Sequence, residues 1–383
     1  MRILHVLPSY VPAVQFGGPV VSTHRLNIEL SNIGHEVSVV TTTAGVPEFA
    51  GRRESVHRVV DGISVTYVPL RWVSRIYWAA GFKQVAASSL VGADLLHSHG
   101  MYLAPGILAF EEARRRRVPS VVSPRGMLMR QAIKSRNRPL KRVVLATIER
   151  RRLRGSTLHF TSEFERQQSD GYSAARSAIV PLGTERFEEQ EMPKDFTVGY
   201  LGRLAPEKNL EALVDVCISL KVPLLLAGGT ASRYASKLVK RAEAAEWIRF
   251  VGRIEPSQRA AFFGRVSVVA LPSFFESFGN AAAEAMSAGR PVIVSKASGI
   301  AEYVEESGAG IVVSQDRVDL SKAIRQLEAE HTARTLLDRA SRARVTATTE
   351  FDWRAVAGRF ERLYSDLVGA KNIAESDTPS VVQ

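Results

Sequence analysis

Two carboxylates flank a small, apolar run in the segment "FFESFGNAAAEAMSAGRPVIVS", residues 274–295. Glu276 lies in the loop after a predicted strand, and Glu284 lies eight residues later on a predicted helix, so both can face one bound molecule and accept its hydroxyls. Ser277 is the expected N-cap of that helix, and the free N–H groups of a helix N-terminus suit an anion. These groups belong to Phe278, Gly279 and Asn280. A capping acid and a solvated helix residue would have the same spacing, so the pair alone leaves both interpretations open.

Two cations follow an earlier predicted strand. In "GYLGRLAPEKNLEALV", Gly202 and Arg203 end the strand, and Lys208 begins the next helix five residues later. Arginine can hold a diphosphate through paired hydrogen bonds, and lysine can hold it as a point charge. This turn therefore suits an anionic ligand, and a surface salt bridge of Lys208 with Glu207 or Glu211 is the structural alternative.

The elements that position these residues are predicted from hydrophobic patterning. Apolar, β-branched runs alternate with helical patterns along the whole chain, which predicts βαβ units and parallel sheets. The predicted strands cover residues 2–7, 36–42, 63–69, 93–100, 120–126 and 158–162 in the first half, and 197–202, 223–229, 248–252, 266–273, 291–295 and 310–313 in the second. A Gly-Gly-Pro loop at 17–19 and a helix at about 22–33 follow the first strand. In such open sheets, ligands bind at the carboxyl ends of the strands, so we expect the function in a cleft between two domains.

The length of 383 residues is sufficient for two domains with separate cores. The segment 183–196 is rich in charge and reads as a linker. We expect domains at 1–182 and 197–351, a helix at about 352–369 that packs back on the first domain, and a disordered tail at 370–383.

Composition narrows the setting of the protein. A single cysteine, Cys217, excludes an intramolecular disulfide and fits a reducing compartment. Neither a signal-peptide pattern nor an apolar run of membrane-spanning length is found, so we expect a cytoplasmic protein. The net charge of +12 is concentrated in residues 111–154, which contain 15 Lys or Arg and 3 acids and leave 36 charges of each sign elsewhere.

This basic segment contains no Phe, Trp or Tyr, so it lacks the stacking side chains of single-strand nucleic acid sites. An anionic membrane attracts cations without aromatic help. In "PLKRVVLATIERRRLR", apolar residues fall near one helical face, which fits either a membrane-facing helix or a core-facing helix with a solvated basic side. The predicted membrane patch consists of Arg114, Arg115, Arg116, Arg117, Lys141, Arg142, Arg150, Arg151 and Arg152.

An ordered set of motifs carries a family resemblance. "GRLAPEKN", "AGG", "FVGRI" and "LPSFFESFGNAAAEAMSAGRPVIVSKASGIAEYV" resemble the donor-binding half of the retaining glycosyltransferases of family 4. The first half is similar as well, in "HVLPSYVPAVQFGGPVVSTHRLNIELSNIGHEVSVVTT", "ADLLHSHG", "SPRGML" and "VPLGTE". Over about residues 1–366, the resemblance implies the α/β GT-B fold, in which two Rossmann-like, doubly wound domains face a cleft. The first domain would bind the acceptor and the second the nucleotide sugar.

The resemblance implies a role for each candidate residue. Arg203 and Lys208 would hold the nucleotide diphosphate and stabilise the charge that develops as the glycosidic bond breaks. Glu284 would bind the ribose hydroxyls, Glu276 would lie near the donor sugar, and His99 of "HSHG" would reach the transferred sugar. The other donor contacts would come from Gly17, Gly18, Gly202, Phe278, Gly279 and Asn280.

The implied reaction is metal-independent transfer of a sugar from a UDP- or GDP-type nucleotide sugar to an acceptor hydroxyl, with retention at the anomeric carbon and no cofactor. No Cys/His spacing of the zinc type is found. Asn280 stands where many relatives have Leu, and Ser298 and Gly299 precede Glu302 where many have Gly-Gly, so donor identity stays open.

The basic patch and the "SPRGML" motif together suggest a lipid-linked saccharide acceptor, as in bacterial surface or exopolysaccharide synthesis, with the protein on the inner face of the plasma membrane. Nucleic acid is not expected as a partner. Aromatic residues in "RWVSRIYWAAGFKQV" fit either an acceptor site or the core: Trp72, Tyr77, Trp78 and Phe82. Two other functions stay open, a nucleotide-sugar 2-epimerase on the same fold and a non-catalytic basic protein that binds nucleic acid or membrane.

Overall fold

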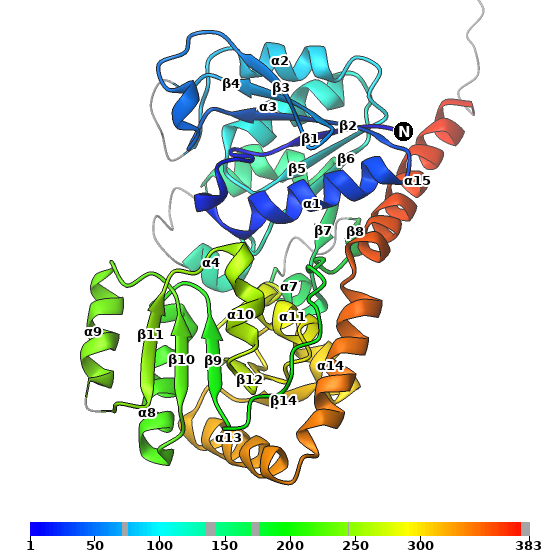
Figure 1. Cartoon of the computed structure of the whole chain (residues 1–383). Helices are drawn as coiled ribbons and strands as arrows, with labels where there is room; N and C mark the ends of the chain where they lie inside the picture. The colour runs from blue at the N-terminus through cyan, green and yellow to red at the C-terminus, as the bar shows by residue number, and fades with distance from the viewer. Residues whose placement is uncertain (71–75, 135–142, 170–175, 244, 377–383) are drawn as a thin grey trace, which may run out of the picture. The chain divides into compact units, whose positions relative to one another are not determined.

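The computed structural model describes residues 1–70, 76–134, 143–169, 176–243 and 245–376. The chain forms two compact units, which we call unit 1 (Met1–Pro181 with Trp353–Gln383) and unit 2 (Leu182–Asp352). Each unit contains one sheet with helices packed on it (Figure 1). The α/β architecture with two largely parallel sheets, predicted from the alternation of patterns, is confirmed.

Unit 1 has an eight-stranded sheet in the order β3-β4-β2-β1-β5-β6-β7-β8. All neighbouring strands are parallel except β3 and β4, which form an antiparallel hairpin. The direction in which strands are added reverses between β1 and β5, and open α/β sheets bind ligands at such a switch point. The strands are β1 (Arg2–Val6), β2 (Glu36–Thr42), β3 (Val56–Val60), β4 (Ile63–Val68), β5 (Leu95–His99), β6 (Ser120–Ser123), β7 (Thr157–Phe160) and β8 (Ser177–Ile179).

Successive strand residues of unit 1 enter two different apolar clusters, one on each face of the sheet. Ile3 and Leu95 pack with residues of α1 and α15, whereas Leu4 and Leu96 pack with residues of α2 and α3. Side chains alternate in direction along a strand, so covering both faces requires near-continuous apolar runs. The helical elements are η1 (Val14–Phe16), α1 (Gly18–Asn32), η2 (Pro47–Phe49), α2 (Phe82–Ser89), α3 (Ala104–Arg115), α4 (Arg130–Lys134), η3 (Leu145–Glu149), α6 (Arg150–Arg154), α7 (Glu163–Gln168) and α15 (Trp353–Ser376).

Two helix boundaries differ from those predicted. Gly18 and Pro19 are not loop residues but form the first turn of α1, where the fixed φ of proline fits and its missing N–H costs nothing. Helix α15 continues to Ser376, so the expected disorder from residue 370 onward is wrong for 370–376. The sequence "GAKNIAES" contains Ala, Lys and Glu, which favour helix continuation.

Unit 2 has a six-stranded parallel sheet in the order β11-β10-β9-β12-β13-β14. Its strands are β9 (Val198–Leu201), β10 (Leu224–Ala227), β11 (Ile248–Gly252), β12 (Val268–Leu271), β13 (Val292–Ser295) and β14 (Gly310–Val313). Its helical elements are η4 (Pro206–Lys208), α8 (Leu210–Leu220), α9 (Arg233–Ala242), η5 (Pro256–Gln258), α10 (Arg259–Phe263), α11 (Asn280–Ser287), α12 (Ala301–Ser307), α13 (Arg317–Thr332) and α14 (Leu336–Glu350).

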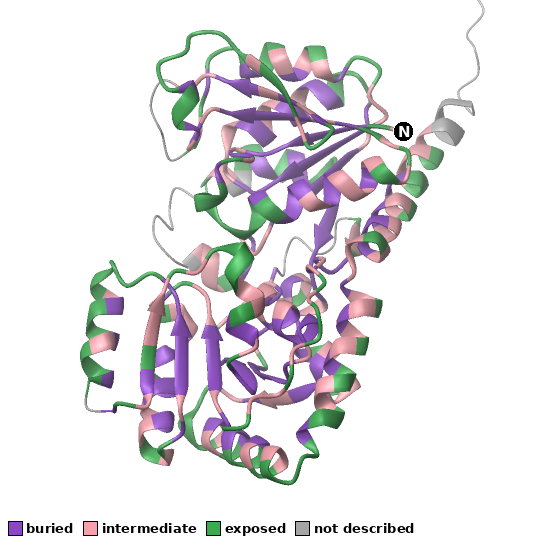
Figure 2. Cartoon of the chain, in the orientation of Figure 1, coloured by how far each residue is buried: buried purple, intermediate pink, exposed green. Residues whose placement is uncertain are grey.

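Burial follows the sheets. Figure 2 shows the central strands of both units buried and the outer faces of the helices exposed. The strand residues of β9, β10, β12 and β13 belong to one apolar cluster with side chains of α8, α11 and α13. Among the described residues, every helix is too short or too polar to cross a bilayer. Because its central strands are buried, each sheet is a firm support for the loops that follow the carboxyl ends of its strands.

Candidate functional site

The first group of candidate residues lies where β9 ends in unit 2. Gly202 has φ +153°, and a Cβ there would lie 2.9 Å from the hydroxyl of Tyr200, so a side chain would disturb the turn. The Tyr200 hydroxyl donates a 2.7 Å hydrogen bond to the carbonyl of Arg203. Close packing of the turn therefore fixes the backbone from which the Arg203 side chain extends.

The structure brings Lys208 and Glu276 together. The Lys208 ammonium donates to Glu276 Oε1, and the Ser273 hydroxyl donates to the same oxygen over 3.0 Å. Both charged side chains are largely shielded, with 16% and 18% of their surface exposed. Glu276 is held by its backbone as well, since its N–H donates to the carbonyl of Ala297 and its carbonyl accepts from Gly299. The pair lies between the ends of neighbouring strands β9, β12 and β13.

Arg203 is arranged differently. Its Nη2 donates a 2.7 Å bond to Glu207 four residues later, and 77% of its side chain is exposed. An exposed ion pair of this kind contributes little to stability, so breaking it to bind another anion costs little. Lys208 is the shielded cation of the turn and Arg203 the accessible one.

The helix after Glu276 begins later than predicted. The N-cap of α11 is Gly279, with φ +120°, and Ser277 lies outside the helix, so the predicted Ser277 cap is wrong. A residue at this φ favours glycine, and a Cβ would lie 3.1 Å from Ile300 and Ser298. The N-cap glycine supplies no side-chain capping hydrogen bond to α11. Phe278 is buried in the core, and Asn280 is the first helical residue, so the backbone of Gly279 and Asn280 forms the uncapped end.

Glu284 has a partner that the sequence did not indicate. Arg259, the first residue of α10, donates a 2.5 Å hydrogen bond from Nη1 to Glu284 Oε1. Burial, together with the nearby Glu185, raises the pKa of Glu284 to about 7, although Arg259 opposes the shift. The two residues are 25 positions apart, and only the packing of α10 beside α11 brings them together. At neutral pH, Glu284 is therefore partly protonated and partly ionised. The hydrogen bond from Arg259 uses Oε1, so Oε2 can accept from a ligand hydroxyl.

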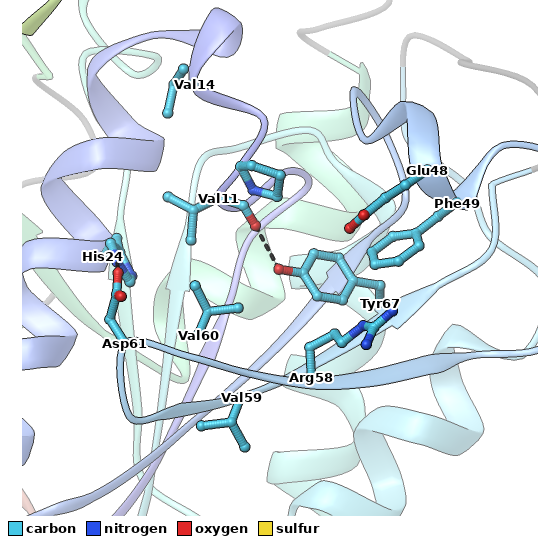
Figure 3. Close-up of a pocket in the computed structure, with 11 residues that line it drawn as sticks. Val11, Val14, His24, Glu48, Phe49, Arg58, Val59, Val60, Asp61 and Tyr67 are labelled. Carbon is cyan, nitrogen blue, oxygen red and sulfur yellow. Dashed lines mark hydrogen bonds and ion pairs between the residues drawn. The ribbon is translucent and has the colours of Figure 1, made fainter.

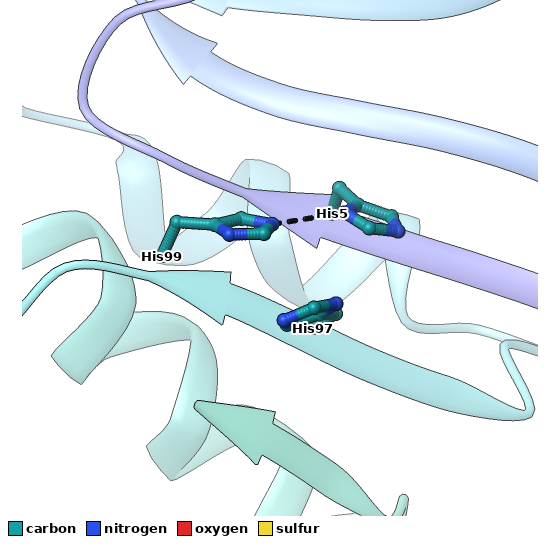
Figure 4. Close-up of side chains that lie close together, drawn as sticks. All are labelled: His5, His97 and His99. Atoms are coloured by element: carbon teal, nitrogen blue, oxygen red, sulfur yellow. Dashed lines mark hydrogen bonds between the residues drawn. The ribbon is translucent and has the colours of Figure 1, made fainter. Parts of the chain in front are cut away.

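The remaining predicted site residues lie in unit 1. Gly17 is the N-cap of α1, with φ +92° and open space where a Cβ would be, and Gly18 begins the helix. His99 ends β5 and is 3% exposed. Figure 4 shows it beside His5 of β1 and His97 of the same strand. The His5 and His99 nitrogens are 3.0 Å apart, and Arg125 Nη2 lies 3.3 Å from Nδ1 of His99.

Proton positions in this cluster follow from the partners. Arg125 can only donate, so His99 Nδ1 accepts, and a neutral His99 then donates from Nε2 to His5 Nδ1. Both His99 nitrogens are thus used within the protein, and contact with a sugar requires His99 to exchange one partner. Burial and the Arg125 charge hold the pKa of His99 well below its usual range, so the ring is neutral.

A second chain of hydrogen bonds runs through His97. The Val180 carbonyl accepts from His159 Nε2 over 2.9 Å, so His159 Nδ1 accepts from the Ser123 hydroxyl over 2.6 Å. Ser123 then accepts from His97 Nε2, and His97 Nδ1 accepts from the hydroxyl of Tyr364 at 2.7 Å. Burial lowers the pKa of His97 and raises that of Tyr364, which keeps both neutral. This His159–Ser123–His97–Tyr364 relay attaches α15 to the sheet.

The cluster is a poor fit for a metal ion, although ligand atoms of His5, His97 and His99 lie within 4.8 Å of one another. His97 already uses both nitrogens, for Ser123 and Tyr364. The Arg125 cation next to His99 would repel a second cation. These three histidines are better described as a buried, neutral, hydrogen-bonded cluster near the carboxyl ends of β1 and β5.

The predicted membrane patch is divided by the structure. Arg152 is wrong as a member, because it is 1% exposed and donates from Nη1 to the buried Glu149 at 3.2 Å and from Nη2 to Ser98 at 2.7 Å. Lys141 and Arg142 lie outside the described residues. The exposed members are Arg114, Arg115, Arg116, Arg117, Arg150 and Arg151. Val143 and Ile148, which precede Arg150 in sequence, are 59% and 50% exposed, so this side of the segment does not face the core.

The aromatic segment is divided as well. Phe82 is 1% exposed in the core, whereas Trp78 is 57% exposed and Tyr77 lies edge-on to Phe16; Trp72 lies outside the described residues. A separate cavity of about 500 Å³, shown in Figure 3, opens between α1, η2 and the β3–β4 hairpin. Valine side chains and Tyr67 line it, with His24, Glu48, Arg58 and Asp61 around them. None of the predicted site residues that the structure describes lines this cavity.

Comparison with known proteins covers both units. A family model described as "Glycosyl transferase 4-like domain" matches residues 17–183, and one described as "Glycosyl transferases group 1" matches residues 183–344. A relative from Komagataeibacter xylinus, named GDP-mannose:cellobiosyl-diphosphopolyprenol alpha-mannosyltransferase, is 26% identical over 96% of this chain and 94% of its own.

Solved structures are similar over the same length. Sucrose-phosphate synthase from Thermosynechococcus elongatus has a TM-score of 0.74 at 21% identity, over 96% of this chain and 99% of its own. HepE from Anabaena in complex with UDP and glucose has a TM-score of 0.70 at 19% identity, over 96% of this chain and all of its own. At these identities the likeness establishes the fold.

Proposed function

This chain belongs to the family 4 glycosyltransferases with the GT-B fold, and from that premise we propose that it transfers a sugar from a nucleotide diphosphate sugar to a hydroxyl of a lipid-linked saccharide, with retention of anomeric configuration. The observation that carries the proposal is the grouping of Lys208, Glu276 and the uncapped α11 at the carboxyl end of the unit 2 sheet. A relative matched over nearly the whole chain is named as a mannosyltransferase acting on a diphosphopolyprenol-linked saccharide.

The chemistry asked of these residues is electrostatic. As the glycosidic bond breaks, negative charge grows on the diphosphate, and cations already in place lower the energy of that transition state. Lys208 meets this requirement from a shielded position, where the effective dielectric is low. Arg203 adds a mobile, bidentate donor, and Glu276 keeps the Lys208 ammonium oriented. In this proposal no metal ion is needed to neutralise the leaving group.

Nucleotide binding tests the donor half of the proposal. We expect calorimetric titration with GDP, UDP, ADP and dTDP to identify one tight ligand, with GDP favoured by the relative's name. Glu284→Ala should weaken that ligand by roughly 10- to 100-fold, since hydrogen bonds to a charged group contribute about 1.5–3 kcal/mol. The control is Glu246→Ala, an exposed carboxylate of the same unit, which should leave affinity unchanged.

The same titrations, repeated at different pH values, test the role of the Glu284 carboxylate. With the Glu284 pKa near 7, the ionised form that accepts ribose hydroxyls is depleted as pH falls. Wild-type affinity should therefore decrease from pH 8 to pH 6, and Glu284→Gln should bind weakly but with little pH dependence. If none of the four nucleotides binds, or if Glu284→Ala binds like wild type, the donor site is elsewhere and the proposed function fails.

We place the acceptor half at an anionic membrane surface. The exposed Arg150 and Arg151 follow the exposed apolar Val143 and Ile148 closely in sequence, a combination that suits the headgroup region. Arg116 and Arg117 are further exposed cations of the same unit. Arg114 and Arg115 contribute less, because each pairs with a glutamate on α3. A lipid-linked acceptor is located at such a surface.

Vesicle binding tests this placement. Replacing Arg116, Arg117, Arg150 and Arg151 with Gln should weaken binding to vesicles containing phosphatidylglycerol by roughly 100- to 1,000-fold, since each cation near the surface contributes about 1 kcal/mol. Sedimentation at two salt concentrations measures the effect. Four exposed cations of unit 2 provide a control with the same charge change: Arg233, Lys237, Lys240 and Arg249. Equal losses in both variants would show that net charge, and not this patch, attracts the membrane.

A further inference from the structure

Arg125 has an unusual position at the carboxyl end of β6. It follows Ser123 and Pro124 and has φ +55°, a left-handed conformation that is uncommon for a residue other than glycine. Its Nη2 lies 3.3 Å from His99 Nδ1 and 3.5 Å from the hydroxyl of Thr23 in α1. The guanidinium thereby joins β5, β6 and α1 beside the point where strand order reverses. Open α/β sheets bind their ligands at this point.

The Arg125 cation has no counter-ion among the residues that the structure describes. Its Nε and Nη1 are covered by protein atoms and lack a hydrogen-bond partner. Its two contacts, His99 and Thr23, are neutral. Glu165 is the nearest acid in electrostatic terms, but it forms no ion pair with Arg125, because its oxygens accept from Gly126 and Thr161.

The surrounding titratable groups supply no negative charge either. His5 and His159 both have pKa values lowered to about 3, mainly by burial, and the neutral His97 and Tyr364 complete the surroundings. Burial lowers the pKa of Arg125 itself to about 10, which reflects the cost of keeping the charge there. A shielded cation without an anion lowers the stability of the free protein. Such a cation is useful when a ligand provides the missing negative charge.

We propose that Arg125 is an anion-binding residue that holds a phosphate group of a substrate at the carboxyl end of the unit 1 sheet. The identity of the anion rests on the proposed function, in which both substrates carry phosphate: the nucleotide sugar and the diphosphate of a lipid-linked acceptor. Arginine binds phosphate through charge-assisted hydrogen bonds, and Arg125 has two donors, Nε and Nη1, without a partner among the described residues. Residue 125 is partly exposed, but Nε and Nη1 are covered, so a phosphate reaches these two donors only after neighbouring side chains move.

Binding of three phosphate probes to the full-length chain tests this inference. Calorimetric titrations use inorganic pyrophosphate, the nucleoside diphosphate selected by the screen above, and farnesyl diphosphate as a short lipid diphosphate. They compare wild type, Arg125→Gln and a control, Arg166→Gln, which removes a surface cation of the same unit. We expect Arg125→Gln to weaken pyrophosphate and one of the other two probes by at least tenfold and Arg166→Gln to weaken neither. The affected probe distinguishes the nucleotide sugar from the acceptor as the source of the phosphate.

Thermal unfolding gives a second, independent readout. If Arg125 serves a ligand, removing the uncompensated charge should raise the melting temperature of the free protein and reduce the stabilisation by pyrophosphate. A structural arginine would behave in the opposite way, with a lower melting temperature and unchanged probe affinity, and that result would overturn the inference. Unchanged affinity of Arg125→Gln for all probes, with Glu284-dependent nucleotide binding retained, would reject Arg125 alone. Absence of nucleotide binding in wild type would reject the proposed function instead.

Discussion

Replacing Lys208 with alanine is expected to lower the turnover number by about 100- to 1,000-fold, the usual loss when one preorganised electrostatic contact to a developing charge is removed. Lys208 donates to Glu276, which also accepts from Ser273, and only 16% of the Lys208 side chain is exposed, so its position is fixed before substrate arrives. Single-turnover rates with the nucleotide sugar of the base selected by titration would measure the effect on the chemical step.

Two companion variants make the Lys208 result specific. Lys208→Arg keeps the charge but changes the geometry, so it should recover part of the rate. Lys237→Ala removes an exposed lysine of α9 in the same unit and should turn over like wild type. Turnover of Lys208→Ala within threefold of wild type would remove Lys208 from the proposed mechanism, provided that its melting temperature shows a folded protein.

Replacing Arg152 with methionine is expected to reduce the free energy of unfolding by about 3–5 kcal/mol. Glu149 is fully buried and accepts from the Tyr102 N–H at 2.6 Å and from Arg152. Without Arg152 it would be a buried carboxylate with an incomplete set of partners, and Ser98 and the Gly100 carbonyl would lose a donor. Equilibrium denaturation with urea, monitored by fluorescence, gives the change.

The neighbouring residue is the matched control for Arg152. Arg151 is exposed on the same helix, and Arg151→Met should change stability by no more than about 0.5 kcal/mol. The double variant Glu149→Gln with Arg152→Met removes both charges and should recover much of the loss, because the unpaired charge causes most of it. An Arg152→Met protein as stable as Arg151→Met would contradict the buried ion pair described above.

Most sheet strands of both units were predictable because they are short, largely apolar runs. All six strands of unit 2 lie within the predicted ranges, and β2 matches its predicted range residue for residue. The two missed strands, β3 and β8, lie at the two edges of the unit 1 sheet. Three of the five β3 residues, His57 to Val59, are exposed, so the strand has no continuous apolar pattern. The Asp61-Gly62 turn, with φ +49° and +80°, was the available hairpin signal.

Candidate site residues were predictable where one short segment contains both the chemically suitable residue types and a characteristic spacing. Lys208 and Glu276 were proposed from separate motifs, and the structure joins them because β9 and β12 are adjacent in the sheet. Arg259 and Arg125 were missed, since their importance arises from neighbours distant in sequence or from the absence of a counter-ion. Helical spacing in "ERRRLR" likewise could not distinguish the buried Arg152 from its exposed neighbours.

Helix α15 gives the chain an unusual order of assembly on the ribosome. Val356, Phe360 and Tyr364 complete the apolar cluster that contains Ile3 and Leu26, and Tyr364 closes the hydrogen-bonded relay to His159. Unit 2 is one continuous segment and can bury its core once Asp352 has emerged. At about 5–20 residues per second, the N-terminal 181 residues wait roughly 10–35 s for their last helix while unit 2 is translated. During that interval the cluster around Ile3 and Leu26 lacks the side chains of α15, and incompletely buried apolar surface of this kind is what chaperones bind. The part synthesised first is therefore the part completed last.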